Sequence, residues 1–352
     1  MRSLVALVLL AQLFSCKATS PPFFPPLVHR IVGCDDPETE EAAAVAVDYI
    51  NSHSLHGYKY ALNVIENVKV LPRRPFGELW HLELDLLETD CHVSNPMPVA
   101  NCTVRKRTQH AVEGDCDVRM LKANGRFSVT STKCHSSPDS AEDVVKFCPD
   151  CPLLALLNDP AVVSAADAAL LVYNSLETTL EHYMITEIAR AQHTHMPPAV
   201  HVEFAIGSTN CTHHANEHVD DNCHLETGNH SHAGFCKATV FKTLNESGEV
   251  ECEIYKEAGH SRSHKHLAGH HIGGNLPSPG HGHTVLNLIH SHNNTLASHE
   301  SHESAERVVP AVLPAVVKRA AVEVASPKGT ASPAVPLGPL KLCPGRTRHF
   351  TL

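Results

Sequence analysis

The chain has 352 residues, with 28 basic side chains, 38 acidic side chains and a formal net charge of −10. An acidic balance disfavours nucleic acids and anionic membranes as partners, because both are themselves negatively charged. The length suggests two domains with additional chain. The sequence contains no stretch of about 18 apolar residues, the length that a membrane-spanning helix needs.

The first 18 residues are typical of a secretion signal. Arg2 supplies the basic start, residues 4–14 form an apolar run, and Ala18 is a small residue suited to cleavage. The sequence therefore predicts a secreted, extracellular protein whose mature chain begins after residue 18.

Twelve cysteines lie beyond this signal, and an even number in an oxidising compartment indicates a disulfide framework. Their positions are Cys34, Cys91, Cys102, Cys116, Cys134, Cys148, Cys151, Cys211, Cys223, Cys236, Cys252 and Cys343. Five sequons fit the same compartment and predict N-glycosylation at Asn101, Asn210, Asn229, Asn245 and Asn293.

The chain contains an internal repeat. The four cysteines from Cys91 to Cys134 recur as the four from Cys211 to Cys252, after 118 to 121 residues in each case. An alanine-rich segment with apolar residues at helical spacing precedes each quartet, at residues 42–51 and 165–174. Each unit is therefore predicted to be one helix followed by several strands.

In the first unit the helix is predicted to start at Asp36, the capping residue, with Pro37 at its first position. Strands are expected at residues 60–71, 79–87, 101–107, 118–122 and 127–132. Asn124-Gly125 predicts a type I′ hairpin turn, and residues 245–248 would form the matching turn of the second unit.

The strand at residues 79–87 alternates between apolar and polar side chains. Trp80, Leu82, Leu84 and Leu86 share one parity, whereas His81, Glu83 and Asp85 share the other. Period-two alternation predicts a strand with a buried face, suited to packing on a helix, and a wet face with carboxylates about 7 Å apart.

These features resemble the cystatin fold, and the duplication resembles the fetuin family within the cystatin superfamily. The resemblance rests on residues 34–42, the acidic strand through His92, and residues 110–117, 136–143, 151–154 and 343–350. It implies an α+β protein with two tandem cystatin-like domains, at residues 29–135 and 153–257, each a helix on an antiparallel sheet. A linker at residues 136–152 and a disordered tail at residues 258–352, rich first in His and then in Ala, Val and Pro, complete the chain.

The resemblance also implies the disulfide pairing. It joins Cys34 to Cys343, Cys91 to Cys102, Cys116 to Cys134, Cys148 to Cys151, Cys211 to Cys223 and Cys236 to Cys252. Cys148 and Cys151 have the spacing of a redox motif, but no thioredoxin-like βαβ pattern surrounds them, so a structural clip between the domains is the preferred interpretation.

The resemblance implies that the acidic sheet of the first domain binds calcium phosphate and inhibits ectopic mineralisation. Calcium takes several oxygen ligands, and a strand cannot wrap a single ion but can present a row of carboxylates to ions fixed in a lattice. The predicted mineral-binding residues are Glu78, Glu83, Asp85, Glu88 and Asp90. Ser140, in an acidic context, is a predicted phosphorylation site. The alternative is a solvated strand face and an unmodified linker serine.

A second hypothesis is inhibition of endopeptidases. Inhibitory cystatins insert a Gln-x-Val-x-Gly hairpin and a Pro-Trp hairpin into papain-type proteases, and neither motif occurs here. Metalloproteases are therefore the more plausible targets. Since no nucleophile motif is found either, we expect a protein without enzymatic activity. We also expect it to be a monomer.

A third hypothesis concerns the tail, where eleven histidines fall between His260 and His302. Imidazoles at such spacing bind Zn²⁺ or Cu²⁺ loosely, and the candidate ligands are His260, His264, His266, His270, His271, His281 and His283. The alternative is a polar tail with incidental metal affinity. No obligatory cofactor is expected, and Lys318-Arg319 is either a dibasic cleavage point or part of an uncut linker.

Overall fold

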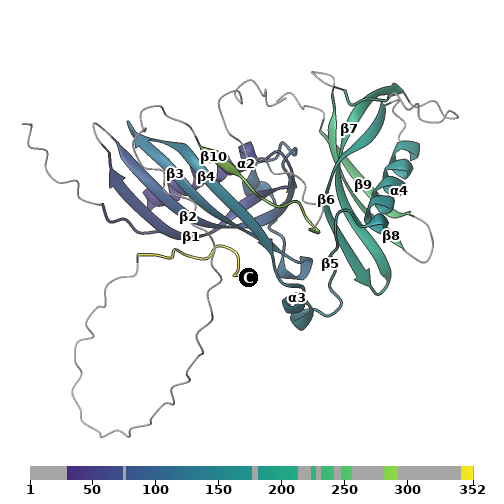
Figure 1. Ribbon diagram of the computed structural model, residues 1–352, viewed down its shortest axis with the longest axis horizontal. Coiled ribbons are helices and arrows are strands. Elements are labelled where there is room, and N and C mark those ends of the chain that lie inside the picture. Colours follow the sequence, from purple (N-terminus) through teal and green to yellow (C-terminus); the bar gives the residue numbers. More distant parts are fainter. Residues whose placement is uncertain are drawn as a thin grey trace, which may run out of the picture.

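The computed structural model describes residues 30–73, 77–176, 181–212, 223–226, 231–241, 247–255, 281–291 and 342–351. Within these ranges the chain forms two five-stranded antiparallel sheets, each with one long helix across it (Figure 1). The predicted α+β class with two cystatin-like domains is confirmed. No helix in these ranges is long and apolar enough to cross a membrane.

The first domain combines one helix with a sheet in the order β1-β2-β3-β4-β10. Its elements are α2 (Pro37–His53), β1 (Tyr58–Pro72), β2 (Glu78–His92), β3 (Val112–Ala123), β4 (Arg126–Pro138) and β10 (Ile289–Ser291). The hairpin between β3 and β4 turns at Asn124 (φ 52°) and Gly125 (φ 74°), so the predicted type I′ turn is confirmed.

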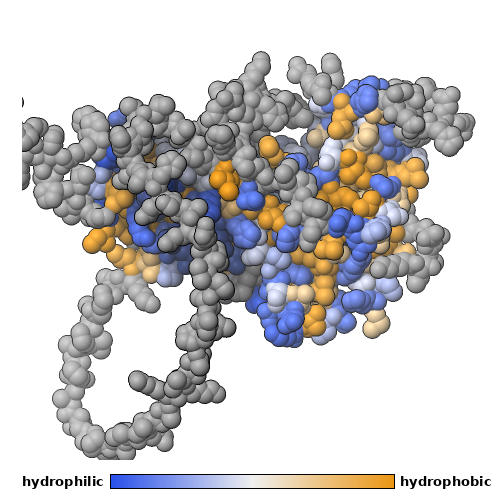
Figure 2. Space-filling model, viewed as in Figure 1, coloured by the Kyte–Doolittle hydropathy of each residue, from blue (hydrophilic) through white to orange (hydrophobic). Residues whose placement is uncertain are grey.

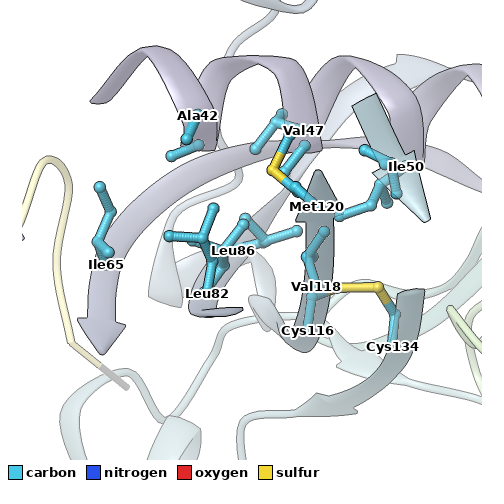
Figure 3. Packing of buried hydrophobic residues seen from close by; sticks show 14 of the residues in the cluster. Ala42, Val47, Ile50, Ile65, Leu82, Leu86, Cys116, Val118, Met120 and Cys134 are labelled. Atoms are coloured by element: carbon cyan, nitrogen blue, oxygen red, sulfur yellow. A yellow bond between two sulfur atoms is a disulfide. The ribbon is translucent and has the colours of Figure 1, made fainter. Parts of the chain in front are cut away.

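The core of the first domain lies between α2 and the sheet. Ala42, Ala46 and Ile50 recur at four-residue spacing and face the inward parity of β2, where Trp80, Leu82, Leu84 and Leu86 are also buried. In Figure 3 Ala42, Val47 and Ile50 project from the helix toward Leu82, Leu86 and Met120, beside the Cys116–Cys134 disulfide. The predicted inward face of the acidic strand is therefore confirmed.

The second domain repeats this plan with a sheet in the order β5-β6-β7-β8-β9. Its elements are β5 (Leu153–Leu154), α4 (Pro160–Leu176), β6 (Glu181–His195), β7 (Pro198–Thr212), β8 (Ala233–Phe241) and β9 (Ser247–Tyr255). Its helix leaves apolar side chains at the surface, with Leu171 70% exposed, and Figure 2 shows apolar residues gathered on this domain.

One hydrogen-bonded contact occurs in both domains between the end of the helix and the strand that follows it. The amide of Asn51 donates to the carbonyl of Tyr60 at 2.9 Å and accepts from the Tyr60 N–H at 2.8 Å. Asn174 makes the same pair of bonds to Tyr183, at 3.0 and 3.2 Å. The asparagine that ends each predicted helix therefore fixes the turn from helix to sheet.

The segment after β2 differs from the prediction. A strand was expected at residues 101–107, but the chain forms two short 3₁₀ helices, η1 (Val99–Asn101) and η2 (Arg107–Gln109), around a single bridge from Val104 to Thr89. The expected strand does not form because the Cys91–Cys102 disulfide closes a short loop that cannot continue the sheet. In the linker, α3 (Ala141–Phe147) precedes the Cys148–Cys151 ring.

The structure contains six disulfides, and they join the same six cysteine pairs that the family resemblance implies. Two of them, Cys116–Cys134 and Cys236–Cys252, lie directly across the equivalent hairpins of the two sheets.

The two domains share a buried interface. A small apolar cluster contains Tyr58 of the first domain together with Ala189, Ala205, Phe235 and Tyr255 of the second. Beside it the ring of His92 stacks on that of Phe235, with centroids 4.8 Å apart. Because buried aromatic and small residues pack together here, the interface resembles a domain core more than a loose contact.

Two carboxylates and two guanidinium groups complete this interface. Glu88 binds Arg190 at 2.8 Å and Arg105 at 3.0 Å, and the Arg105 guanidinium also contacts Glu203 at 2.6 Å. All four side chains are buried or nearly so, which makes removal of any one costly, because its partner would be left as an uncompensated buried charge.

The prediction of a wholly disordered tail is wrong for two segments. Residues 281–291 lie across both domains, with Leu286 and Leu288 in the first core, and residues 342–351 lie along β1 (Figure 1). The second segment is attached by Cys343 to Cys34 and by Arg348 to Glu40 at 2.6 Å. Low overall hydrophobicity concealed the few apolar and paired residues that hold these segments.

Candidate functional site

The outer face of the first sheet, opposite α2, carries carboxylates on three adjacent strands. We call this set the acidic face, and it consists of Glu66 on β1, Glu83 and Asp85 on β2, and Glu113, Asp115 and Asp117 on β3. Strand register places Glu83 directly opposite Asp117 and Asp85 directly opposite Asp115. An open depression on this face is lined by Glu66, Glu83, Asp115 and Asp117.

Like charges at opposed positions of neighbouring strands repel each other, and side chains there are about 5 Å apart at Cβ. Four of the six carboxylates are exposed, whereas Glu113 is half-buried and Asp85 is buried. Lys133 and His135 of β4 border the same depression, so the face is not entirely without basic groups. The arrangement nevertheless costs stability unless cations lie over it.

Glu83 is the predicted mineral-binding residue that the structure leaves most open. Its side chain is 50% exposed, and its nearest basic group is the Lys69 ammonium at 3.8 Å. The Asn67 amide donates to the same carboxylate at 3.1 Å. A pair so exposed is weak, and Glu83 is free to exchange Lys69 for another cation.

Asp85 shares the parity of Glu83 but is only 6% exposed, which corrects the prediction of an open row. Its carboxylate accepts from the Asn63 amide at 2.8 Å, and Asn63 in turn donates to the carbonyl of Phe350 in the C-terminal segment. Burial, and then the nearby charges of Glu113 and Asp115, raise the pKa of Asp85 to about 7, against the opposing effect of the Asn63 bond.

The other three predicted mineral-binding residues do not belong to the acidic face. Glu78 has the parity of Trp80 and binds Arg30 at 3.2 Å. Glu88, also of that parity, is 1% exposed and bound in the interdomain interface. Asp90, near the end of β2 and again of that parity, is half-buried and accepts from the Thr103 N–H at 2.9 Å. These corrections have one cause, since acids adjacent in sequence alternate between faces of a strand.

Sequence reasoning missed four members of the acidic face: Glu66, Glu113, Asp115 and Asp117. The last three alternate with buried residues along β3, in the same period-two pattern that identified β2. That signal was present in residues 110–117, but only strand pairing shows that it lies beside Glu83.

Two of the predicted tail ligands fall within the described ranges. His281 is exposed, whereas His283 is fully buried against the second domain, and burial together with Arg190 lowers its pKa to about 3. Its placement does not suit a loosely bound metal at the surface, which corrects that prediction for His283. Among the described residues no group of three or more His, Cys, Asp or Glu side chains could hold a metal ion. His260, His264, His266, His270 and His271 lie outside them.

Some of the predicted modification sites lie within the described residues and others lie outside them. Asn101 and Asn210 are exposed, and Ser140 is exposed at the start of α3, where its hydroxyl accepts from the Asp143 N–H at 3.0 Å. Asn229, Asn245 and Asn293 lie outside the described residues, as do the signal and Lys318-Arg319. Glycosylation and phosphorylation stay predictions.

Comparison with known proteins shows which family the chain belongs to. The cystatin domain model matches residues 152–245. The antihemorrhagic factor cHLP-B of Gloydius brevicauda is 47% identical over the full length of both chains. Alpha-2-HS-glycoprotein of Bos taurus is 50% identical over 73% of this chain and 70% of its own. The chain belongs to the fetuin family.

A solved structure agrees with this assignment. Mouse fetuin-B, in an inhibitory complex with human meprin beta, is 26% identical with a TM-score of 0.53, over 66% of this chain and 74% of that one. Fetuins and their cystatin-fold relatives are inhibitors or binding proteins without enzymatic activity, and so is this chain. A fetuin acts by binding, so the acidic face must be judged by what it can bind.

Proposed function

We propose that this fetuin is a secreted glycoprotein that binds calcium phosphate through the acidic face of its first domain and so inhibits ectopic mineralisation. The observation that supports this function is the set of carboxylates on three neighbouring strands, of which Glu66, Glu83, Asp115 and Asp117 are exposed. Strands are about 4.8 Å apart and alternate residues about 7 Å apart, so the oxygens form a nearly planar array. A planar array suits calcium ions already held in a solid, whereas a single ion prefers ligands that surround it.

The test is a triple variant, Glu83→Gln/Asp115→Asn/Asp117→Asn, which neutralises the exposed centre of the face. We expect it to shorten several-fold the delay that the intact protein imposes on calcium phosphate precipitation, measured by turbidity in a supersaturated solution. The fold should persist, because all three side chains are exposed.

The matched control is Glu249→Gln/Glu251→Gln/Glu253→Gln, which removes the same number of exposed acids from β9 of the second domain. It changes net charge equally and should leave the delay intact. Equal loss in both variants would attribute the effect to net charge, and an unchanged delay in the first variant would remove the acidic face as the site.

Inhibition of metalloproteases is the second candidate function, and the relatives favour it. One full-length relative is named an antihemorrhagic factor, and mouse fetuin-B is solved as an inhibitory complex with meprin beta. A metalloprotease keeps an open position on its catalytic zinc, which a carboxylate can fill. Asp150 is exposed within the four-residue ring that the Cys148–Cys151 disulfide closes, so this loop offers such a group on a rigid frame.

Replacement of this residue, Asp150→Asn, tests whether the ring contacts the protease. If it does, the inhibition constant for meprin beta should rise about 30-fold, which corresponds to about 2 kcal/mol for a charged partner lost from a complex. Glu142→Gln, an exposed acid nearby in α3, is the control and should have no effect. Undiminished inhibition by Asp150→Asn would exclude this loop.

A further inference from the structure

Residues 281–291, here called the clamp segment, are bound by both domains although they belong to the histidine-rich region. At its start the segment lies along the second domain. The Leu157 N–H donates to the carbonyl of His281 at 3.1 Å, and the Ala191 N–H donates to that of Gly282 at 3.0 Å. The Thr284 N–H donates back to the carbonyl of Ala189 at 3.0 Å. These bonds attach the segment to β6 and to the chain before α4.

At its other end the clamp segment lies along the first domain. The Leu286 N–H donates to the Ser136 hydroxyl at 2.7 Å, and the Cys134 N–H donates to the carbonyl of Leu288 at 2.9 Å. Residues 289–291 then pair with β4 as β10, and Figure 1 shows this strand running beside β4 toward the second sheet. Leu286 and Leu288 are each 1% exposed and form part of the first core.

Between these ends a single carboxylate connects all three parts. Glu187 of β6 accepts from the Thr284 hydroxyl at 2.7 Å and from the Gly57 N–H of the first domain at 2.8 Å. The His56 ring lies 3.0 Å from the same carboxylate. The clamp segment therefore occupies a groove that neither domain forms alone.

From Thr284 onward the side chains of the clamp segment follow a period of two. Thr284, Leu286 and Leu288 are buried, whereas Val285, Asn287 and Ile289 are half-buried or exposed. Before them Gly282 and His283 are both buried. The glycine is required by space, because a Cβ at residue 282 would lie 2.6 Å from the Cβ of Leu154. Backbone bonds along an extended segment, with pockets for alternate side chains, are the way in which sheet edges recognise peptides.

We propose that the groove is a peptide-binding site specific for an extended Gly-His-Thr-x-Leu-x-Leu segment. Its occupant is the clamp segment of the same chain, which holds the two domains in one arrangement and can be replaced by a free peptide. In the sequence 25 residues separate Tyr255 from His281. Because the segment belongs to the same chain, its effective concentration at the groove is on the order of millimolar, so a free peptide competes poorly until the segment is weakened.

The experiment uses the full chain and a fluorescent peptide with the sequence of residues 281–291. The variant Leu286→Asp/Leu288→Asp disfavours the segment within the chain, because two carboxylates cannot enter the first core. The variant should bind the peptide at least tenfold more tightly than the unaltered chain, measured by fluorescence anisotropy. A peptide with Gly282→Val is the control and should bind at least tenfold more weakly than the unaltered peptide.

Hydrogen exchange supplies the second measurement. The Ala191 and Cys134 amides donate to clamp carbonyls, so their exchange should accelerate at least tenfold in the variant and return when the peptide is added. Amides in the middle of β2 should not change. Should the double variant fail to fold, Gly282→Val in the full chain serves in its place. This substitution displaces only the start of the clamp segment from the second domain and leaves Leu286 and Leu288 in the first core.

Equal peptide binding by the variant and the unaltered chain would overturn the proposal, as would unchanged exchange at both amides in a folded variant. A concentration-dependent dimer of the unaltered chain that dissociates when the peptide is added would show that a second copy supplies the segment, which would also overturn it.

Discussion

Where the first sheet carries Asp115, the second sheet carries Phe235. Each of these residues precedes the equivalent hairpin cysteine, and each lies opposite a residue of the preceding strand, Asp85 in one case and Ala205 in the other. One step along, the opposed pair Glu83 and Asp117 becomes Glu203 and Lys237. The inner faces of the two sheets, by contrast, remain apolar and each packs on its helix.

This difference shows what a duplicated module can change without loss of its fold. The inner face must stay apolar in both copies, since it forms the core with the helix. The outer face is under no such constraint, so one copy presents carboxylates to its surroundings and the other buries an apolar and ion-paired surface against its neighbour. In consequence, the exposed acids of the first sheet extend over three neighbouring strands, whereas Glu249, Glu251 and Glu253 of the second sheet lie on the single strand β9.

The strongest way to break this comparison is to give the second sheet the residue of the first. Phe235→Asp would remove an aromatic side chain from the interface and leave an unpaired carboxylate there. We expect a loss of at least about 3–5 kcal/mol in the free energy of unfolding, measured by urea denaturation. Lys237→Gln, exposed two residues further along the same strand, should change it by less than about 0.5 kcal/mol. A tolerated Phe235→Asp would mean that the interface is not held by this cluster.

The hydrogen bonds of Asn51 and Asn174 at the ends of the two helices are a feature that should be the same in both domains. Asn51→Ala and Asn174→Ala each leave the N–H and carbonyl of a buried tyrosine without their partner. Each substitution should therefore cost about 1–3 kcal/mol, again by urea denaturation. Widely different costs would show that the two copies do not rely on the same turn from helix to sheet.

The pH dependence of Asp85 gives the smallest effect. In the unfolded chain its pKa is about 3.9, and in the folded protein it is about 7. The folded state therefore binds more protons between these values, so stability from this group is fully present below pH 4 and is lost as pH rises through 7. Without calcium, the midpoint of thermal unfolding should fall from about pH 4 to about pH 7 more steeply than in Asp85→Asn. Parallel curves would indicate that Asp85 titrates as an ordinary surface acid.

Prediction from sequence was most successful where a pattern is local. The repeat, the two helices with their terminal asparagines, the hairpin at Asn124 and the inward face of β2 all depend on spacing along the chain. The acidic face was found in part, because Glu83 and Asp85 alternate with leucines. It was incomplete because its other half lies on β3, and because Glu78 and Glu88 were grouped with it by nearness in sequence alone.

The sequence by itself therefore determined the two modules, their disulfide-forming cysteines and the strand on which acids gather, since periodicity and cysteine count follow from the order of residues. Tertiary structure decided which acids share a face, that Asp85 is covered by the C-terminal segment, and that Glu88 joins two domains. It also placed residues 281–291 between the domains. These outcomes depend on strand register and on contacts between segments far apart in the chain, which no local pattern specifies.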